Sequence, residues 1–295
     1  MRYRRLMTMR VDHVSIAVKD MDTALGFFRT CLPIEMHTDK RPGYTDDFNW
    51  CDFYIGPFKL ELIEPTRPDS FVRRFLDRRG EGLHHLSLEV TDLPPLLERL
   101  EADGIRIVDR FEAGDGYRTA FISPRSAHGV LIQFWQVPHI ADPPRPRTAR
   151  LRLRSGETVV MRINHVSIAV RDIDATLAFF RRYFPVSGGR PAHLGYDRHF
   201  VLTQFKLNGY KVELIGEAPG QPSGFVTRFL ERRGEGFHHL SIDVDRLDPL
   251  LAQLTADGVR IVDRFAFRSG RQTAFISPRS AHGVLIQFWQ EPHLV

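Results

Sequence analysis

The sequence predicts an α+β fold of four strand–helix–three-strand (βαβββ) modules, arranged as two tandem halves. First, the segment TAFISPRSAHGVLIQFWQ at residues 119–136 recurs unchanged at residues 273–290. Second, each half contains two stretches that alternate apolar and polar residues, as a strand does, and each runs into an amphipathic helical pattern. Third, further strand-like stretches follow each predicted helix.

The duplication also indicates the domain organisation. DHVSIAVKDMDTAL from residue 12 corresponds to NHVSIAVRDIDATL from residue 164, and FVRRFLDRRGEG from residue 71 corresponds to FVTRFLERRGEG from residue 225. Repetition over such a length indicates tandem duplication. We therefore expect one domain at residues 9–137, a Pro- and Arg-rich linker at residues 138–160, and a second domain at residues 161–295.

The elements of the first half follow in order. A predicted strand at residues 11–18 runs into a helix after Asp20, and a second one at residues 83–90 runs into a helix after Asp92 that stops near Gly104. Alternation and β-branched or aromatic residues predict the remaining strands at residues 48–55, 58–63, 105–111, 118–122 and 130–135.

Composition narrows the class of protein. With 295 residues, of which 42% are hydrophobic, the chain is long enough to bury a sizeable core. No run reaches the roughly 20 apolar residues of a membrane span, and the first residues lack the apolar core of a signal peptide, so we expect a cytoplasmic protein without a membrane partner. Cys31 and Cys51 have no counterparts in the second half, which argues against a disulfide framework or a thiolate metal site.

The formal net charge of +5 is partly local, because five arginines lie between residues 145 and 154. Neutralisation of nucleic-acid phosphates is one explanation for such a run. No aromatic stacking platform or recognition-helix motif accompanies it, so we favour a solvated linker and expect no nucleic-acid partner.

Two strand-like stretches carry histidines on a definite face. In LHHLSLEV (83–90), His84 shares one face with the apolar residues, whereas His85 shares the other face with Ser87 and Glu89. In VDHVSIAV (11–18), the same alternation separates His13 from the apolar face. Because the apolar face must pack on a helix, His13 and His85 are expected to point to the opposite side of the sheet.

Polar residues recur on the last strand of each module. Glu61 and Gln133 each lie between two large apolar residues, and each follows its module's histidine by 48 residues. The second half has the same interval. The two resulting sets are His13, Glu61, His85 and Gln133 in the first half, and His165, Glu213, His239 and Gln287 in the second.

Two imidazoles, one carboxylate and one amide oxygen on one face are typical of a divalent-metal site with positions left open for water and substrate. Nitrogen and oxygen ligands without thiolate favour Mn, Fe, Co, Ni or Zn in a reactive site over structural zinc. The alternative is that these are ordinary buried polar residues copied by duplication. Their constant spacing and shared face favour metal binding.

Both halves resemble the vicinal oxygen chelate (glyoxalase/bleomycin resistance/dioxygenase) superfamily, and within it they are most similar to the methylmalonyl-CoA epimerase family. The resemblance rests on DHVSIAV, KLELIEP, RFLDRRGEGLHHLSLEV and SPRSAHGVLIQFWQ with their second-half partners. It implies paired βαβββ modules that form cupped mixed sheets, and it places the family's metal positions on the two sets above. In the epimerases the last of these positions is usually Glu, whereas this chain has Gln.

The resemblance implies a divalent-metal-dependent enzyme that chelates a carbonyl or carboxylate substrate with adjacent oxygens and stabilises an enolate, as an epimerase, isomerase or lyase does. The base in the epimerases is a Glu ahead of the third strand. The corresponding stretches are YTDDF and YDRHF, in which Asp46 and Asp197 are the base candidates. A role as solvated loop carboxylates is the alternative for both.

Two other functions stay open. A non-haem Fe(II) dioxygenase of the same fold is less favoured, because its carboxylate comes from the last strand, where this chain has Gln133 and Gln287. A non-catalytic, ligand-sequestering protein of the resistance type would typically lack the metal ligands. Trp135 and Trp289 share a face with these glutamines, so the substrate can be bulky or aromatic, although both can equally be core residues. We expect a monomer that imitates a dimer, or a homodimer.

Overall fold

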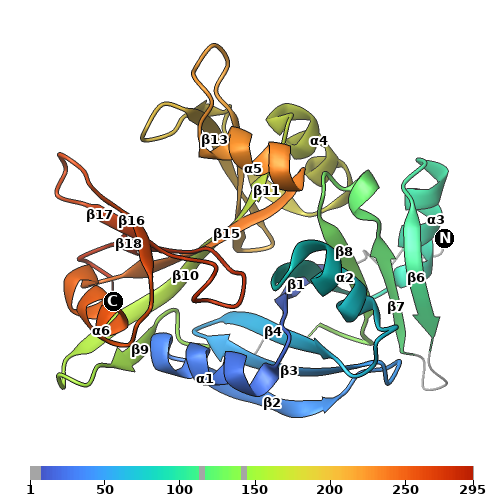
Figure 1. Ribbon diagram of the computed structural model, residues 1–295. Helices are drawn as coiled ribbons and strands as arrows, with labels where there is room; N and C mark the ends of the chain where they lie inside the picture. Colours follow the sequence, from blue (N-terminus) through green and yellow to red (C-terminus); the bar gives the residue numbers. More distant parts are fainter. Residues whose placement is uncertain (1–7, 113–116, 141–144, 295) are drawn as a thin grey trace. The chain divides into compact units, whose positions relative to one another are not determined.

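The computed structural model describes residues 8–112, 117–140 and 145–294 (Figure 1). In the first half the elements are β1 Met9–Ala17, α1 Met21–Cys31, β2 Glu35–Pro42, β3 Phe48–Ile55, β4 Phe58–Pro65, α2 Phe71–Arg79, β5 Gly82–Val90, α3 Leu93–Ala102, β6 Ile107–Glu112, β7 Arg118–Ile122, the 3-10 turn η1 Pro124–Ser126, and β8 Leu131–Gln136.

In the second half they are β9 Ala149–Arg152, β10 Thr158–Ala169, α4 Ile173–Tyr183, β11 Val186–Gly188, β12 His193–Leu194, β13 Phe200–Leu207, β14 Tyr210–Glu217, α5 Phe225–Arg233, β15 Gly236–Val244, α6 Leu247–Ala256, β16 Ile261–Ala266, β17 Gln272–Ile276 and β18 Ile286–Gln290. Each half thus contains two copies of the strand–helix–strands module.

Each sequence half forms one mixed sheet. The strand order is β2-β3-β4-β1-β5-β8-β7-β6 in the first and β11-β13-β14-β10-β15-β18-β17-β16 in the second, where β9 also pairs with β10 and β12 with β13. The sheets are mixed because β8 runs parallel to β5, and β18 parallel to β15, whereas neighbours such as β3 and β4 are antiparallel. The predicted α+β fold of tandem modules is confirmed.

Local signals explain where the helices begin and end. Asp20 accepts a hydrogen bond from the Thr23 amide at 2.7 Å and so caps α1, whose buried face includes Met21, Leu25 and Phe28. The helix expected after Asp92 is α3. Helix α2 was not expected from the sequence: Ser70 caps it at the Val72 amide, and Gly80 ends it with a φ of 72°.

Side chains from α2 complete part of the core. Val72 and Leu76 pack with Ala17, Phe48 and Ile63, and the partly buried rings of neighbouring aromatic residues close this cluster. The second half repeats the cluster with Val226 and Leu230 of α5.

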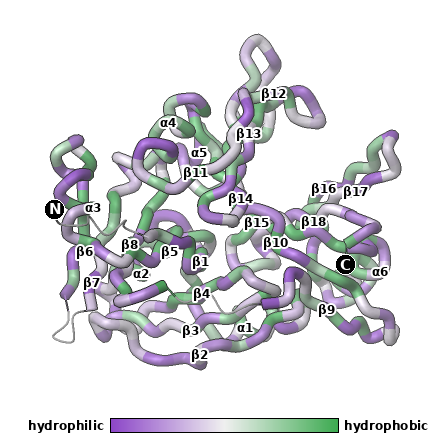
Figure 2. The backbone as a smooth tube through the Cα atoms, turned by 180° about the vertical axis from the view of Figure 1, so that it is seen from behind, coloured by the Kyte–Doolittle hydropathy of each residue, from purple (hydrophilic) through white to green (hydrophobic). Residues whose placement is uncertain are grey.

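The edge strand β2 is mainly hydrophilic (Figure 2), as expected for an edge that must not pair with another chain.

Contacts divide the chain into two compact units, and each unit contains segments of both sequence halves. One consists of Met1–His13, His85–Pro143 and Ser167–His238, and the other of Val14–His84, Pro144–Val166 and His239–Val295. The sheets follow the sequence halves but these units do not, so the domain boundaries at residues 9–137 and 161–295 stay a prediction.

A close backbone contact recurs inside each unit. A Cβ atom placed on Gly129 would lie 2.1 Å from the Glu235 carbonyl oxygen, and one placed on Gly283 would lie 1.7 Å from the Glu81 carbonyl oxygen. Only glycine fits such an approach. This explains why the repeated sequence SAHG ends in glycine.

The segment predicted as a linker contains regular structure and internal contacts. Strand β9 pairs antiparallel with β10. The Arg145 guanidinium lies 3.4 Å from the centre of the Tyr54 ring and 3.3 Å from the Glu35 carboxylate, and Arg154 forms an ion pair with Asp257. Two of the linker arginines therefore contact side chains of the same chain.

None of the helices in the described residues is long and apolar enough to cross a membrane.

Candidate metal centre

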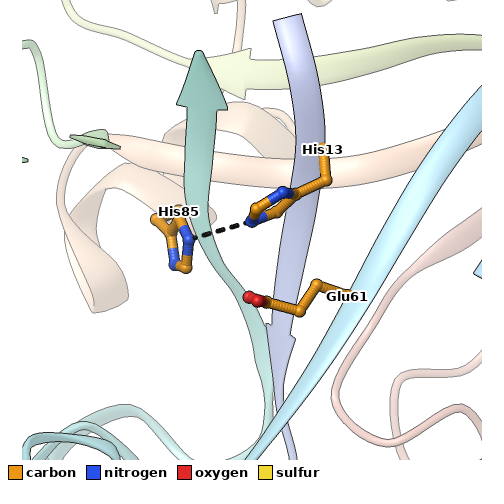
Figure 3. Close-up of side chains that lie close together, drawn as sticks. All are labelled: His13, Glu61 and His85. Atoms are coloured by element: carbon orange, nitrogen blue, oxygen red, sulfur yellow. Dashed lines mark hydrogen bonds between the residues drawn. The ribbon is translucent and has the colours of Figure 1, made fainter. Parts of the chain in front are cut away.

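Three side chains of the first half converge from three different strands. His13 comes from β1, Glu61 from β4 and His85 from β5, and Figure 3 shows them pointing toward one another. One ligand atom from each lies within 4.8 Å of the other two. The Nε2 atoms of the two histidines are 3.3 Å apart, and the histidines are only 6% and 4% exposed.

The neighbour of His13 determines which of its ring nitrogens is available. The Asp12 carboxylate lies 2.7 Å from His13 Nδ1, so Nδ1 is the protonated nitrogen and donates to it. The lone pair of Nε2 is then directed at the group. A carboxylate in this position is the common second partner of metal-binding histidines, because it fixes the ring and raises its basicity.

The second half contains the same arrangement. One ligand atom from each of His165, Glu213 and His239 again lies within 4.8 Å of the other two, and the Nε2 atoms of the two histidines are 3.3 Å apart. Here His165 Nδ1 donates to the side-chain oxygen of Asn164 at 2.8 Å. Glu213 accepts hydrogen bonds from Gln204 and Ser167, at 2.8 and 3.2 Å.

The two glutamines occupy equivalent strand positions beside these groups. Gln133 Oε1 lies 3.1 Å from His85 Nε2, while its amide nitrogen donates to the Thr119 hydroxyl at 3.3 Å. Gln287 is 4% exposed and pairs with Ser241 of β15, as Gln133 pairs with Ser87 of β5. The structure thus brings Gln133 to the first group and places Gln287 at the matching register position.

The donor set fits a divalent cation. Each group offers two imidazole nitrogens and a carboxylate in a site where the histidines are buried, and such a set suits Zn, Fe, Mn, Co or Ni. The hydroxyl groups of Ser15, Ser87 and Ser241, each two residues after a grouped histidine, are buried without a hydrogen-bond partner among the described residues. Polar atoms left in this state are typical of a site completed by water, an ion or a ligand. Metal binding by the eight predicted residues stays a prediction.

A further carboxylate lies next to the first group. Asp52 of β3 is paired directly with Glu61 of β4 and is 4% exposed. Its carboxylate is 3.0 Å from His37 Nδ1 and 3.6 Å from Lys59 Nζ. The equivalent position in the second half is Gln204, which pairs with Glu213.

Sequence reasoning missed both Asp12 and Asp52. Asp12 belongs to the apolar row of its strand, and a polar residue in such a row needs a buried partner, which is the signal that could have identified it. Asp52 gives no such signal, because its position opposite Glu61 depends on the register of β3 against β4.

The two base candidates lie outside the groups. Asp46 is exposed in the turn before β3 with a φ of 56°, and Asp197 accepts a hydrogen bond from the His199 amide in the loop before β13. The 152-residue offset that relates His13 to His165 pairs Asp46 with Arg198, which has a similar φ of 63°. The two candidates therefore do not occupy equivalent positions, and their catalytic role stays a proposal.

The neighbouring histidines, His84 and His238, face the opposite side of their strands. Burial lowers the pKa of each to about 4, so both rings are neutral at pH 7. The centre of the His84 ring lies 4.6 Å from the centre of the Phe75 ring. The corresponding distance between His238 and Phe229 is 4.8 Å. These histidines belong to the packing on α2 and α5.

Each tryptophan ring lies against a second aromatic ring. The ring centres of Trp135 and Tyr117 lie 4.0 Å apart, and the residue Tyr117 is 37% exposed. The Trp289 ring stacks on Phe267 at 5.3 Å, with the Arg271 guanidinium 5.6 Å from its centre. Both tryptophans are half-buried, on the strands that also carry Gln133 and Gln287.

One protein family matches both halves of this chain. The sequence model of the Glyoxalase/Bleomycin resistance protein/Dioxygenase superfamily matches residues 12–121 and 164–275. The uncharacterised protein YqjC of Bacillus subtilis is 36% identical over 127 residues, which cover 42% of this chain and 89% of YqjC. The ethylmalonyl-CoA/methylmalonyl-CoA epimerase of Cereibacter sphaeroides is 29% identical over 135 residues, which cover 43% of this chain and 98% of that enzyme.

Among solved structures, a mutant of 4-hydroxymandelate synthase from Streptomyces coelicolor resembles the whole chain. Its TM-score is 0.61 at 17% identity, and the match covers 97% of this chain and 93% of the synthase. At this identity the similarity shows that the two chains share a tandem fold.

Proposed function

Because the chain belongs to the glyoxalase/bleomycin resistance protein/dioxygenase superfamily, we propose that it is a divalent-metal-dependent enzyme that binds a carbonyl or carboxylate substrate with adjacent oxygens. The reaction that we propose is proton transfer next to a carbonyl, as in an epimerase, isomerase or lyase. The epimerase of Cereibacter sphaeroides, which matches about one half of this chain, supports this reaction class.

One observation carries the proposal: two histidines and one glutamate from three strands form a compact group, and the chain contains this group twice. We propose that His13, Glu61, His85 and Gln133 hold one cation, and that His165, Glu213, His239 and Gln287 hold another. A divalent cation at such a site supplies Lewis-acid polarisation of a substrate carbonyl.

The chain's own groups orient this site. The side-chain oxygens of Asp12 and Asn164 hold Nδ1 of His13 and of His165, so Nε2 is the nitrogen available in each case. Thr119 holds the Gln133 amide group so that its oxygen is directed toward His85. The hydroxyls of Ser15, Ser87 and Ser241, which have no hydrogen-bond partner among the described residues, are donors that a bound water or substrate oxygen can accept from.

The proposed proton transfer requires a base near the substrate. Asp46 and Asp197 remain the base candidates from the loops before β3 and β13. Asp52 is a third candidate, because it is buried and lies on the same face as Glu61, directly across the strand pair. Replacing each aspartate by Asn in turn, and measuring exchange of the substrate proton, separates the three.

Aromatic residues on the strands of the two glutamines bear on the substrate class. Trp135, which is edge-to-face with Tyr117, and Trp289, which stacks on Phe267, present aromatic surfaces on the strands that carry Gln133 and Gln287. We propose that these surfaces contact a bulky or aromatic part of the substrate.

Exchange with solvent deuterium tests the reaction class directly. The purified chain, loaded with Co²⁺ under argon, is incubated in D₂O with a panel of aliphatic and aromatic carbonyl acids that carry a proton next to the carbonyl. Loss of that proton's NMR signal, abolished by EDTA, is the expected result. If no member of the panel exchanges while the metal is bound, the proposed reaction class is wrong.

The ligand set also favours one second candidate, a non-haem Fe(II) dioxygenase. Two histidines and one carboxylate with open positions are the facial triad of such enzymes. The 4-hydroxymandelate synthase shares the fold of the whole chain. Fe²⁺-specific turnover that consumes oxygen, measured with an oxygen electrode on the same panel, would identify this alternative.

A further inference from the structure

The two groups have the same ligands but different charges around them. An offset of 152 residues relates the first module of each half, so each neighbour of His13 and Glu61 can be compared with its counterpart around His165 and Glu213. Three neighbouring positions differ in charge, and all three make the first site more negative than the second.

The first difference concerns the partner of the first histidine. Asp12 accepts from His13 Nδ1 at 2.7 Å, whereas Asn164 accepts from His165 Nδ1 at 2.8 Å. The geometry is nearly the same, but a carboxylate adds a full negative charge and makes the ring a stronger donor to a cation. Asp12 is only 7% exposed, so solvent screens this charge little.

Further from the metal ligands than Asp12 and Asn164, each half has one arginine–carboxylate ion pair, whose two charges balance. The Asn164 amide nitrogen donates to both oxygens of Asp243, and Arg162 pairs with that carboxylate. In the first half, Arg10 pairs with Glu89 at 2.7 Å. These ion pairs therefore do not cancel the difference between Asp12 and Asn164.

The second difference concerns the neighbour of the ligand carboxylate. Asp52 lies opposite Glu61, whereas Gln204 lies opposite Glu213 and donates to it at 2.8 Å. A buried carboxylate beside Glu61 adds negative charge, but an amide that donates to Glu213 competes with a cation for an oxygen lone pair. Lys59 and Lys211, which occupy equivalent positions, do not change this comparison.

The third difference is smaller. Lys206 pairs across the strands with Lys211, where the first half pairs Tyr54 with Lys59. The second site thus has one more positive charge nearby. Because Lys206 is exposed, solvent and salt screen its effect.

We propose that the two sites bind divalent cations with unequal affinity, the group of His13, Glu61 and His85 being the tighter one. This rests on the proposed function, since it requires both groups to bind metal. Outer partners of metal ligands typically change affinity by about 10–100-fold. The first site is therefore filled at a free cation concentration at least about tenfold lower than the second. The second site loads only when the free cation is more abundant.

Calorimetric titration of the metal-free chain with Co²⁺ tests this inference. The wild-type chain should show two steps of about one ion each, with dissociation constants at least about tenfold apart. His13→Ala should remove the tighter step and His165→Ala the weaker one. Asp12→Asn should weaken the tighter step alone, and Gln204→Asp, which replaces the amide that donates to Glu213, should strengthen the weaker one.

The chain itself supplies the matched control, because each of these two substitutions reproduces the residue found at the equivalent position of the other half. Circular dichroism checks that the variants fold. Two steps of equal affinity, or a tighter step that His165→Ala removes, would overturn the inference while leaving metal binding intact. Absence of any Co²⁺ binding would overturn the proposed function as well.

Discussion

The Nε2 atoms of His13 and His85 lie 3.3 Å apart, although the two residues are separated by 72 positions in the sequence. With Nδ1 of His13 held by Asp12, the Nε2 lone pair of His13 faces the other ring. Two imidazoles in this arrangement are stabilised by a shared proton or by a cation between them. The same distance separates His165 and His239, so the arrangement belongs to the fold of both halves.

Glu61→Gln tests the contribution of the carboxylate. The substitution keeps the shape of the side chain but removes the negative charge of the first group, so Co²⁺ affinity at that site should fall by at least about tenfold. Isothermal titration against the wild-type chain measures the change. Glu64→Gln is the matched control on the same strand, because Glu64 binds Lys40 and the Met21 amide instead of the histidines. Equal losses in both variants would exclude a specific role for Glu61.

The buried His84 and the half-buried His238 predict a loss of stability in mild acid. Their pKa is about 4 in the folded chain and about 6.5 when unfolded, so the unfolded state binds more protons between these values. Stability is therefore fully present above about pH 6.5 and falls as the pH drops toward 4. At pH 5 the loss is about 2 kcal/mol for each ring.

Urea unfolding at pH 7 and pH 5, in the presence of EDTA, measures this loss. His84→Leu should reduce the difference in unfolding free energy between the two pH values by about 2 kcal/mol. A variant that keeps the whole wild-type difference would show that this ring does not carry the effect.

The close contact at Gly129 predicts a strong effect of a single methyl group. Gly129→Ala places a Cβ 2.1 Å from the Glu235 carbonyl oxygen and also strains a φ of 81°. Gly104 has a similar φ of 77° but no atom within 4 Å of the added Cβ, so Gly104→Ala measures the backbone strain alone.

We expect Gly104→Ala to cost about 1–2 kcal/mol of unfolding free energy, and Gly129→Ala to cost about 1–3 kcal/mol more. Thermal or urea unfolding compares the two variants with the wild-type chain. Equal losses would mean that the backbone at Gly129 moves away freely.

The two cysteines should be unreactive in the folded chain. Both are buried, and burial raises the pKa of each thiol to about 12, so almost no thiolate exists at pH 8. Ellman's reagent should therefore release no rapid signal from the native protein and two equivalents after unfolding in guanidinium chloride. A fast native reaction would place one of the thiols at the surface.

Much of the fold was predictable from the sequence because its signals are local or repeated. Strand β3 has the predicted bounds of residues 48–55, and the alternation in LHHLSLEV correctly assigns His84 and His85 to opposite faces of β5. Helix α2 was missed, because most of its nine residues are polar and only Val72 and Leu76 are buried. Its cap at Ser70 was the available signal.

The site was predictable to the extent that the alternation of side chains between the two faces of a strand defines it. The 48-residue interval identified residues that share a face, and the structure brings His13, Glu61 and His85 together. This alternation does not determine the register of β3 against β4, so it could not place Asp52 opposite Glu61. It also says nothing about loops, which is why Asp46 and Asp197 were chosen by resemblance and lie at non-equivalent positions.

Metal analysis of the purified chain is the most direct test of the account. At a free Co²⁺ concentration that saturates both sites, equilibrium dialysis followed by mass spectrometry should find nearly two bound ions per wild-type chain, nearly one in His85→Ala, and nearly none when His239→Ala is added. A wild-type chain without bound metal, or a His85→Ala variant with unchanged metal content, would contradict the central claim that these side chains form two cation sites.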